Sequence, residues 1–155
     1  MSDSKELLEK LTKRTIEYTS QHLGMDEIVK EYKIESKEIF EFLDISAKIE
    51  LSGYIEGFVV LSVSKELALE LADKSTFNEI DESILKELKG ESIAEILNIV
   101  LGNILRYLDG VKQGKILDMS APKITKTSYI VKDKKEILVC MLSYKSEKII
   151  LSYFI

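Results

Sequence analysis

The stretch Glu91-Ser-Ile-Ala-Glu-Ile-Leu-Asn-Ile-Val-Leu-Gly-Asn-Ile-Leu-Arg106 has the clearest helical pattern in the chain. At about 100° per residue, its large apolar side chains and those just beyond it gather on one half of a helical wheel. They are Ile93, Ile96, Leu97, Val100, Leu101, Ile104, Leu105 and Leu108. The other half is polar and includes Glu91, Glu95 and Asn98. We predict a helix that packs its apolar face on a core and exposes its polar face.

Two residues depart from this pattern. Ile99 is the only large apolar side chain on the polar half, and Gly102 costs about 1 kcal/mol relative to alanine inside a helix. Both lie beside Glu95 and Asn98 on the wheel. We therefore interpret the exposed face of this helix as a surface on which another molecule docks.

On the N-terminal side of this helix the period of the apolar residues is two. Alternation from Ile45 to Ser52 predicts a half-buried strand, 53–57 a turn, and 58–63 the return strand of a hairpin. Ser64 is expected to cap a short helix from Lys65 to about Lys74.

The chain opens with a second helical pattern, from Asp3 to about His22, which Gly24 would end. Residues 25–31 could add a turn or two of helix. The central helix is expected to begin near Ser83, with a brief interruption possible at Gly90, and Asp109-Gly110 is expected to close it.

Everything after that helix is strand-like. The segments expected to form strands are 115–119, 124–131, 137–142 and 149–155, with a charged turn at 132–136. Since 137–142 is apolar on both faces, we expect it in the centre of a sheet. Consecutive strands joined by short turns pair antiparallel. We predict a single α+β domain, residues 1–155, with an antiparallel β-sheet packed by helices.

Composition excludes several classes of protein. The chain has 155 residues and a formal net charge of −5, so nucleic acid and anionic membrane surfaces are poor partners. No apolar run approaches the roughly 20 residues of a membrane span, and the N-terminus lacks the apolar core of a signal peptide. The single cysteine, Cys140, lies in an apolar run and is expected to be a buried thiol. We expect a cytoplasmic protein.

The usual catalytic motifs are missing from the sequence. His22 is the only histidine and is expected at the surface, and neither a zinc-binding spacing nor a phosphate-binding glycine loop occurs. Glu95 and Asn98 remain, three residues apart on one helix face. A carboxamide can orient a water molecule and a carboxylate can hold a partner's cation. Phosphoryl hydrolysis needs little beyond a positioned water and charge stabilisation when another molecule supplies the metal and the phosphate. The three-residue spacing alone does not distinguish such a site from a Glu95/Asn98 pair that is merely solvated.

The run Glu95-Ile-Leu-Asn98-Ile-Val-Leu-Gly102-Asn103 resembles the Glu-x-x-Asn helix of the CheC/CheX/FliY phosphatases of bacterial chemotaxis. Residues 49–61 resemble the family's glycine-bearing hairpin, and 67–72 its alanine-rich helix. Ser120-Ala-Pro122 falls at the family's usual distance past the asparagine. The likeness covers roughly residues 45–125. It is closest to the CheX branch, since there is one such helix and the first helix contains no asparagine.

The resemblance implies a CheC/CheX-like fold and a phosphatase that acts on the phospho-aspartate of a CheY-like response regulator. In the implied mechanism Asn98 positions the attacking water and Glu95 forms a salt bridge to the regulator's active-site lysine. Magnesium would belong to the regulator, so no metal or cofactor is expected on this chain. The resemblance also implies a homodimer that pairs through its sheets.

Three further residues are assigned to partner binding. Ile99 would supply an apolar contact and Gly102 would let the partner's backbone approach closely, which we infer from the helical wheel. Glu91 stands where the family pattern often has Asp or Ser, so it keeps an acidic charge with a different reach. Two alternatives stay open: a catalytically silent CheX-like domain that binds a response regulator or motor component, and an unrelated α+β scaffold.

Overall fold

A computed structural model of the chain describes residues 3–26, 29–37, 40–75, 82–125, 130–131 and 137–154. Its helices are α1 (Asp3–Leu23), α2 (Lys65–Ser75), α3 (Glu82–Leu105) and α4 (Asp109–Lys112). Its strands are β1 (Val29–Lys37), β2 (Phe40–Glu41), β3 (Ile45–Gly53), β4 (Gly57–Val63), β5 (Leu117–Met119), β6 (Lys123–Thr125), β7 (Ile130–Val131), β8 (Ile137–Tyr144) and β9 (Glu147–Phe154).

The main sheet has the strand order β1-β8-β9-β4-β3-β5, and β6 also pairs with β3. Every pairing in it is antiparallel. Strand β9 lies in the middle of the sheet, hydrogen-bonded to β8 on one side and to β4 on the other. The predicted antiparallel α+β fold is confirmed, and β8, which contains 137–142, is an interior strand as expected.

Tight turns join neighbouring strands of this sheet. In the β3–β4 turn, Gly53 and Gly57 have φ angles of 120° and 125°, which residues with side chains rarely adopt. A Cβ on Gly57 would also collide with the carbonyl oxygen of Phe154 on β9. Lys145 and Ser146, between β8 and β9, both have positive φ, as a two-residue hairpin turn requires.

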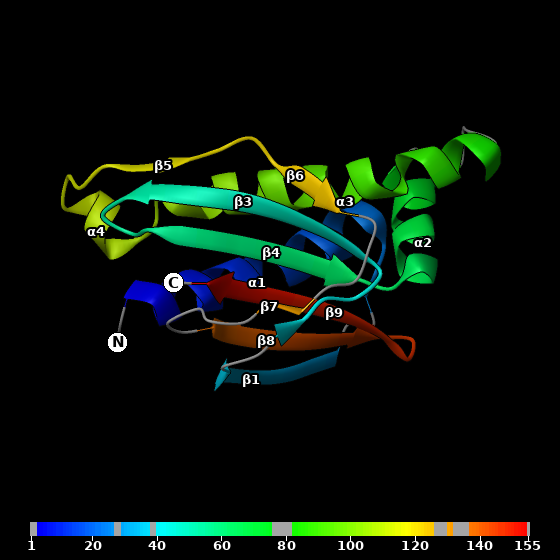
Figure 1. Ribbon diagram of the computed structural model, residues 1–155, viewed down its shortest axis with the longest axis horizontal. Helices are drawn as coiled ribbons and strands as arrows, with labels where there is room; N and C mark the ends of the chain where they lie inside the picture. The colour runs from blue at the N-terminus through cyan, green and yellow to red at the C-terminus, as the bar shows by residue number, and fades with distance from the viewer. Residues whose placement is uncertain are drawn as a thin grey trace.

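The two faces of the sheet bury different sets of side chains. Helices α1 and α3 lie along one face and α2 lies at its end (Figure 1). Alternate residues of β3, β4, β8 and β9 point into this helix-covered core, Cys140 among them. The intervening residues form a smaller cluster on the other face, around Val60, Val139, Ile150 and Phe154, where Phe42 packs after β2.

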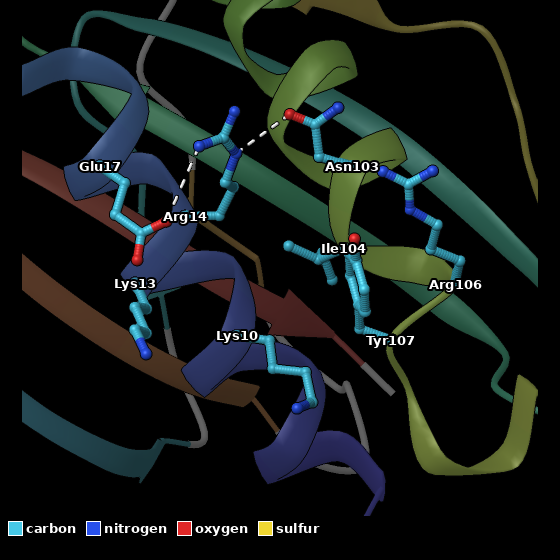
Figure 2. Close-up of a pocket in the computed structure, with 8 residues that line it drawn as sticks. All are labelled: Lys10, Lys13, Arg14, Glu17, Asn103, Ile104, Arg106 and Tyr107. Carbon is cyan, nitrogen blue, oxygen red and sulfur yellow. Dashed lines mark hydrogen bonds and ion pairs between the residues drawn. The ribbon is translucent and has the colours of Figure 1, made fainter. Parts of the chain in front are cut away.

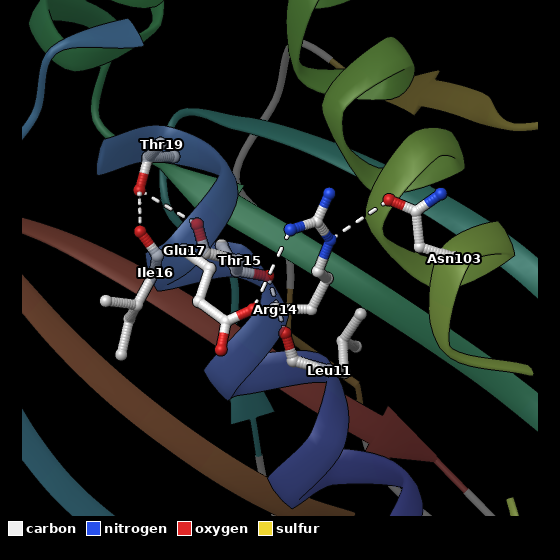
Figure 3. A network of polar contacts seen from close by, with 7 residues as sticks. All are labelled: Leu11, Arg14, Thr15, Ile16, Glu17, Thr19 and Asn103. Atoms are coloured by element: carbon white, nitrogen blue, oxygen red, sulfur yellow. Dashed lines mark hydrogen bonds and ion pairs between the residues drawn. The ribbon is translucent and has the colours of Figure 1, made fainter. Parts of the chain in front are cut away.

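Helix α1 is fixed along the sheet by an unusual set of buried groups. Leu7, Leu8 and Leu11 are fully buried. Further along, the buried positions are threonines whose hydroxyls donate to backbone carbonyls one turn earlier, as at Thr15 and Thr19 (Figure 3). Threonine therefore continues the buried stripe without leaving a hydroxyl unsatisfied.

Helix α3 confirms the predicted wheel with three differences. Its apolar positions from Ile93 to Ile104 are buried and Leu105 is half-buried. Ser92, on the polar half of the wheel, is buried, and Gly90 does not interrupt the helix. The helix ends at Leu105 instead of Leu108, because Asp109 begins the short helix α4, where its amide donates to the Glu6 carboxylate at 3.0 Å.

The expected helical turns at 25–31 are wrong, because Met25 and Asp26 lie outside a helix and a strand begins at Val29. Val29–Lys37 is strand β1, paired antiparallel with β8 and with one register shift between Glu31 and Glu35. Its charged sequence has no clear strand period, and the pairing to β8 determines its conformation. The expected strand at 115–119 is shorter than predicted, being Leu117–Met119 (β5). In the expected strand at 124–131, the described residues belong to β6 at one end and β7 at the other, and 126–129 lie outside the described residues. The expected charged turn at 132–136 lies outside the described residues.

Over the described part of the chain, no helix combines the length and the apolar character that crossing a membrane would demand.

We predict that Gly57→Ala destabilises the domain. The substitution forces a side chain into a positive-φ conformation and against the Phe154 carbonyl, so urea unfolding should show a loss of about 3 kcal/mol. Gly102→Ala is the matched control, because a Cβ there meets nothing within 4 Å. In a helix interior that change should stabilise by up to about 1 kcal/mol. Equal effects of the two substitutions would contradict the account of the hairpin.

Candidate functional site

The predicted site residues all lie on the outward side of α3. Glu91, Glu95, Asn98 and Gly102 are exposed, and Ile99 is half-buried. At 1.5 Å rise per residue, Glu95 and Asn98 are about 4.5 Å apart along the helix axis. The structure therefore brings the five residues together on one helix face, as the wheel predicted.

This face is held in place by what lies behind it. Ile96, Leu97 and Val100, which flank Glu95 and Asn98 in sequence, are almost completely buried against the sheet and α2. Rotation of α3 about its axis would expose these side chains. The orientation of Glu95 and Asn98 toward solvent is thus a consequence of core packing.

Within the described residues, neither Glu95 nor Asn98 has a hydrogen-bond or ion-pair partner on its side chain. A carboxylate in this position is an acceptor available to a cation of another molecule. A carboxamide has both a donor and an acceptor available, so it can hold a water molecule in a chosen orientation. The pair can thus act on a partner that presents its own reactive group.

Helix α1 forms one wall of the site, which the sequence did not reveal. It runs antiparallel to α3, and Arg14 Nε donates to Asn103 Oδ1 at 3.0 Å (Figure 3). The same guanidinium lies 3.7 Å from the Glu17 carboxylate. Arg14, Glu17 and Tyr18 are spaced as neighbours on one helix face, but nothing in the sequence shows that this face meets α3.

Tyr18 lies at the Glu95 end of this wall. Its half-buried position raises the pKa of its hydroxyl, and the negative charge of Glu95 raises it further, while Arg14 lowers it. The ring also packs against His22, with 4.9 Å between the ring centroids. His22 is exposed, as predicted. Tyr18 is therefore a neighbour of the Glu95/Asn98 pair supplied by another helix.

Between α1 and the end of α3 is a groove of about 450 Å³, which we call the α1–α3 groove (Figure 2). It is lined by Lys10, Lys13, Arg14, Glu17, Asn103, Ile104, Arg106 and Tyr107.

In the described residues, no group of three or more histidine, cysteine, aspartate or glutamate side chains is arranged to hold a metal ion.

We predict that Glu95→Gln lowers the pKa of Tyr18, because the neighbouring negative charge is removed while burial remains. A nuclear magnetic resonance titration of ring-labelled tyrosine would measure it. The control is Glu91→Gln, since Glu91 is not among the groups that shift Tyr18. An unchanged Tyr18 pKa in Glu95→Gln would contradict the proximity of the two groups.

The raised pKa of Tyr18 also determines how the free energy of unfolding changes with pH. The folded pKa of Tyr18 lies above its ordinary value of 10.0. The folded state therefore keeps this proton at a pH where the unfolded state has begun to lose it. The contribution of Tyr18 to the free energy of unfolding is complete below pH 10 and is lost as pH rises through the folded pKa.

Comparison with known proteins gives the fold and the site a family context. A family model described as chemotaxis phosphatase CheX matches residues 45–143, which is more than half of the chain. The match begins with β3, contains the whole of α3, and reaches β8. No curated protein sequence matches the chain.

Several solved structures share the fold. CheX from Vibrio vulnificus has a TM-score of 0.77 at 19% identity, over 96% of this chain and 98% of that one. A putative chemotaxis protein from Desulfovibrio vulgaris Hildenborough has a TM-score of 0.77 at 16% identity, over 100% of both chains. A structure of the CheX–CheY–BeF3–Mg2+ complex from Borrelia burgdorferi has a TM-score of 0.68 at 21% identity, over 96% of this chain and 96% of that one.

At these identities the solved structures show the shared fold. The family match includes α3, the helix that carries Glu95 and Asn98. The chain belongs to the CheX family of chemotaxis phosphatases.

Proposed function

We propose that this protein hydrolyses the phospho-aspartate of a CheY-like response regulator. The observation that carries the proposal is the Glu95/Asn98 pair, exposed and one turn apart on a helix that the core holds rigidly, in a chain of the CheX family. The complex of the Borrelia burgdorferi structure, which contains CheX, CheY, BeF3 and Mg2+, supports the choice of partner.

In this proposal Asn98 enters the regulator's active site and orients the attacking water in line with the phosphoryl group. The carboxamide oxygen accepts a hydrogen bond from the water, and the amide group remains available as a donor. Phosphoryl transfer depends mainly on positioning and charge stabilisation, so a single well-placed amide can contribute strongly. Magnesium is expected on the regulator, where it would neutralise phosphoryl charge.

Glu95 is proposed to form a salt bridge to a lysine in the regulator's active site. Its side chain is exposed in the free protein, so it loses solvation only when the partner docks. Because Glu95 and Asn98 share one rigid helix, this salt bridge would also fix the position of the carboxamide. The two residues would therefore have separate roles, one in binding and one in catalysis.

Ile99, Gly102 and Glu91 complete the proposed docking surface. Ile99 is half-buried and offers an apolar contact beside the reactive pair. The outward side of Gly102 is open, with nothing within 4 Å of the position of a Cβ, which allows the partner's backbone to approach closely. Glu91 adds a second exposed carboxylate one turn before Glu95.

We predict that Asn98→Ala lowers kcat about 100-fold for loss of phosphate from the regulator, since the water is no longer oriented. Glu95→Gln keeps the shape of the side chain but removes its charge, and should raise KM about tenfold. Release of inorganic phosphate from the acetyl-phosphate-loaded regulator measures both constants.

Matched controls come from exposed side chains directly after α4 and on α2. Gln113→Ala removes a carboxamide and Glu66→Gln removes a carboxylate charge, and neither should change the kinetics. A wild-type protein that binds the phosphorylated regulator without speeding phosphate loss would be the catalytically silent domain. Full activity in Asn98→Ala would leave the function standing and refute the role of Asn98.

We also propose that two copies pair through a sheet edge. Strand β1 forms one end of the strand order, while the other end is formed by the short strands β5 and β6 on β3. A nine-residue strand at an edge presents more backbone donors and acceptors than either three-residue strand. We therefore place the contact at β1.

Light scattering during size-exclusion chromatography should give twice the chain mass of 17.7 kDa. Replacing Ile34 in the middle of β1 with proline, which disrupts ladder hydrogen bonding, should shift the protein toward the monomer. Circular dichroism would verify that the variant is folded. A wild-type protein that elutes at 17.7 kDa over the accessible concentration range would refute the dimer.

A further inference from the structure

The α1–α3 groove has a charge opposite to that of the protein as a whole. Lys10, Lys13, Arg14 and Arg106 line it with a single carboxylate, Glu17 (Figure 2). The chain carries a net charge of −5. Four cations around one shallow groove are therefore a local reversal of the protein's charge, and they favour an anionic occupant.

Two of these cations are engaged within the fold. Arg14 is held by Asn103 and Glu17, and Lys10 lies 3.9 Å from the Glu6 carboxylate. Lys13 and Arg106 are exposed and have no carboxylate partner in the part of the chain that the structure describes. Arg106 lies 5.0 Å from the ring of Tyr107, which leaves its charge unneutralised.

The helix dipole explains only part of this arrangement. Arg106 directly follows α3, where the partial negative charge of the helix C-terminus favours a cation. Lys13 lies in the middle of α1, far from either helix end, so the helix dipole does not account for its position.

The groove is continuous with the Glu95/Asn98 face. Asn103, which is adjacent to Gly102, lies in its wall, and Arg106 is about 12 Å along the helix axis from Asn98. A small interface of about 600 Å² on each partner corresponds to a disc of roughly 14 Å radius. A protein docked on Asn98 would therefore cover Arg106 and the groove.

The groove also offers an apolar contact beside its charges. Tyr107 is 50% exposed, and Ile104 contributes to the lining. Tyrosine and arginine are the residue types enriched among the energetically dominant contacts of protein interfaces. An exposed tyrosine beside uncompensated cations is the composition expected where an acidic segment of another protein is bound.

We propose that the α1–α3 groove binds an acidic segment of the same response regulator that presents its phosphoryl group to Asn98. The inference rests on the proposed function and adds a second contact to it. The reacting atoms would be handled by Glu95 and Asn98, while Lys13 and Arg106 would select regulators that carry carboxylates at the matching position. Charge of this kind acts on association rate and partner choice.

The test compares two double charge reversals. Lys13→Glu/Arg106→Glu changes the groove, and Lys65→Glu/Lys148→Glu makes the same change in net charge at exposed positions outside it. Binding is measured by titration with CheY proteins of the host organism carrying BeF3− and Mg2+, at low and high potassium chloride. Hydrolysis is measured on the same CheY proteins in phosphorylated form.

We expect the groove variant to raise Kd and KM about 30-fold at low salt, corresponding to two lost exposed ion pairs of about 1 kcal/mol each. The difference from wild type should shrink at high salt. Its kcat at saturating CheY should be unchanged, and the control variant should behave as wild type. Thermal unfolding of both variants would show that they remain folded.

The possible outcomes separate the groove from the phosphatase. A wild type that accelerates phosphate loss, with a groove variant of unchanged Kd, would overturn the groove proposal and leave the function intact. A wild type that binds without hydrolysis, and a groove variant that loses binding, would support the groove and refute the enzyme. A wild type that does neither would refute both.

A small anion is the alternative occupant, and the same variants test it. Inorganic pyrophosphate titrated into the wild type in the absence of CheY should not bind measurably. Saturable pyrophosphate binding that is lost in Lys13→Glu/Arg106→Glu, with unchanged CheY affinity, would overturn the proposal in favour of a small-molecule anion site.

Discussion

The packing of the apolar side of α3 on the sheet is the constraint on which the rest of the site depends. Ile93, Leu97, Val100 and Leu101 are fully buried, and each would lose on the order of 2 kcal/mol of transfer free energy if the helix rotated it into water. Rotation is thereby prevented, so Glu95 and Asn98 point outward although no side-chain hydrogen bond or ion pair among the described residues holds them. The Glu95/Asn98 pair is positioned by the core beneath it.

Helix α1 adds a second level of organisation, because it meets α3 and α4 through polar groups. Glu6 accepts from the amide of Asp109 at the start of α4, Arg14 donates to Asn103 on α3, and Tyr18 lies near Glu95 on α3. This order runs antiparallel along α1 and the α3–α4 segment. The candidate site is therefore a surface formed by α1 and α3, with the Glu95/Asn98 face at one end and the α1–α3 groove at the other. The CheX family match begins at residue 45, so α1 lies outside it.

The extent to which sequence predicts this protein follows from where the determining contacts lie. Three features depend on contacts between neighbours in sequence and were predictable. They are the β3–β4 hairpin, the buried and exposed faces of α3, and the cap at Ser64, whose hydroxyl accepts from the Leu67 amide at 3.2 Å. Strand β1 was not, because its structure depends on β8. The buried threonines of α1 and the Arg14–Asn103 contact were missed for the same reason.

The place of β9 in the sheet has a consequence for how the domain assembles. Phe58 on β4 pairs with Phe154 on β9, 96 residues later in the chain. Strands β1 and β8 are joined to β4 and β3 through β9. Pairings between such distant segments are slow to form, because the intervening chain must lose much of its freedom first. The surface on which α1 and α3 rest is therefore incomplete until β9 inserts. A folding intermediate that lacks this strand would have α3 without its full support, so the fixed orientation of Glu95 and Asn98 would follow the insertion of β9.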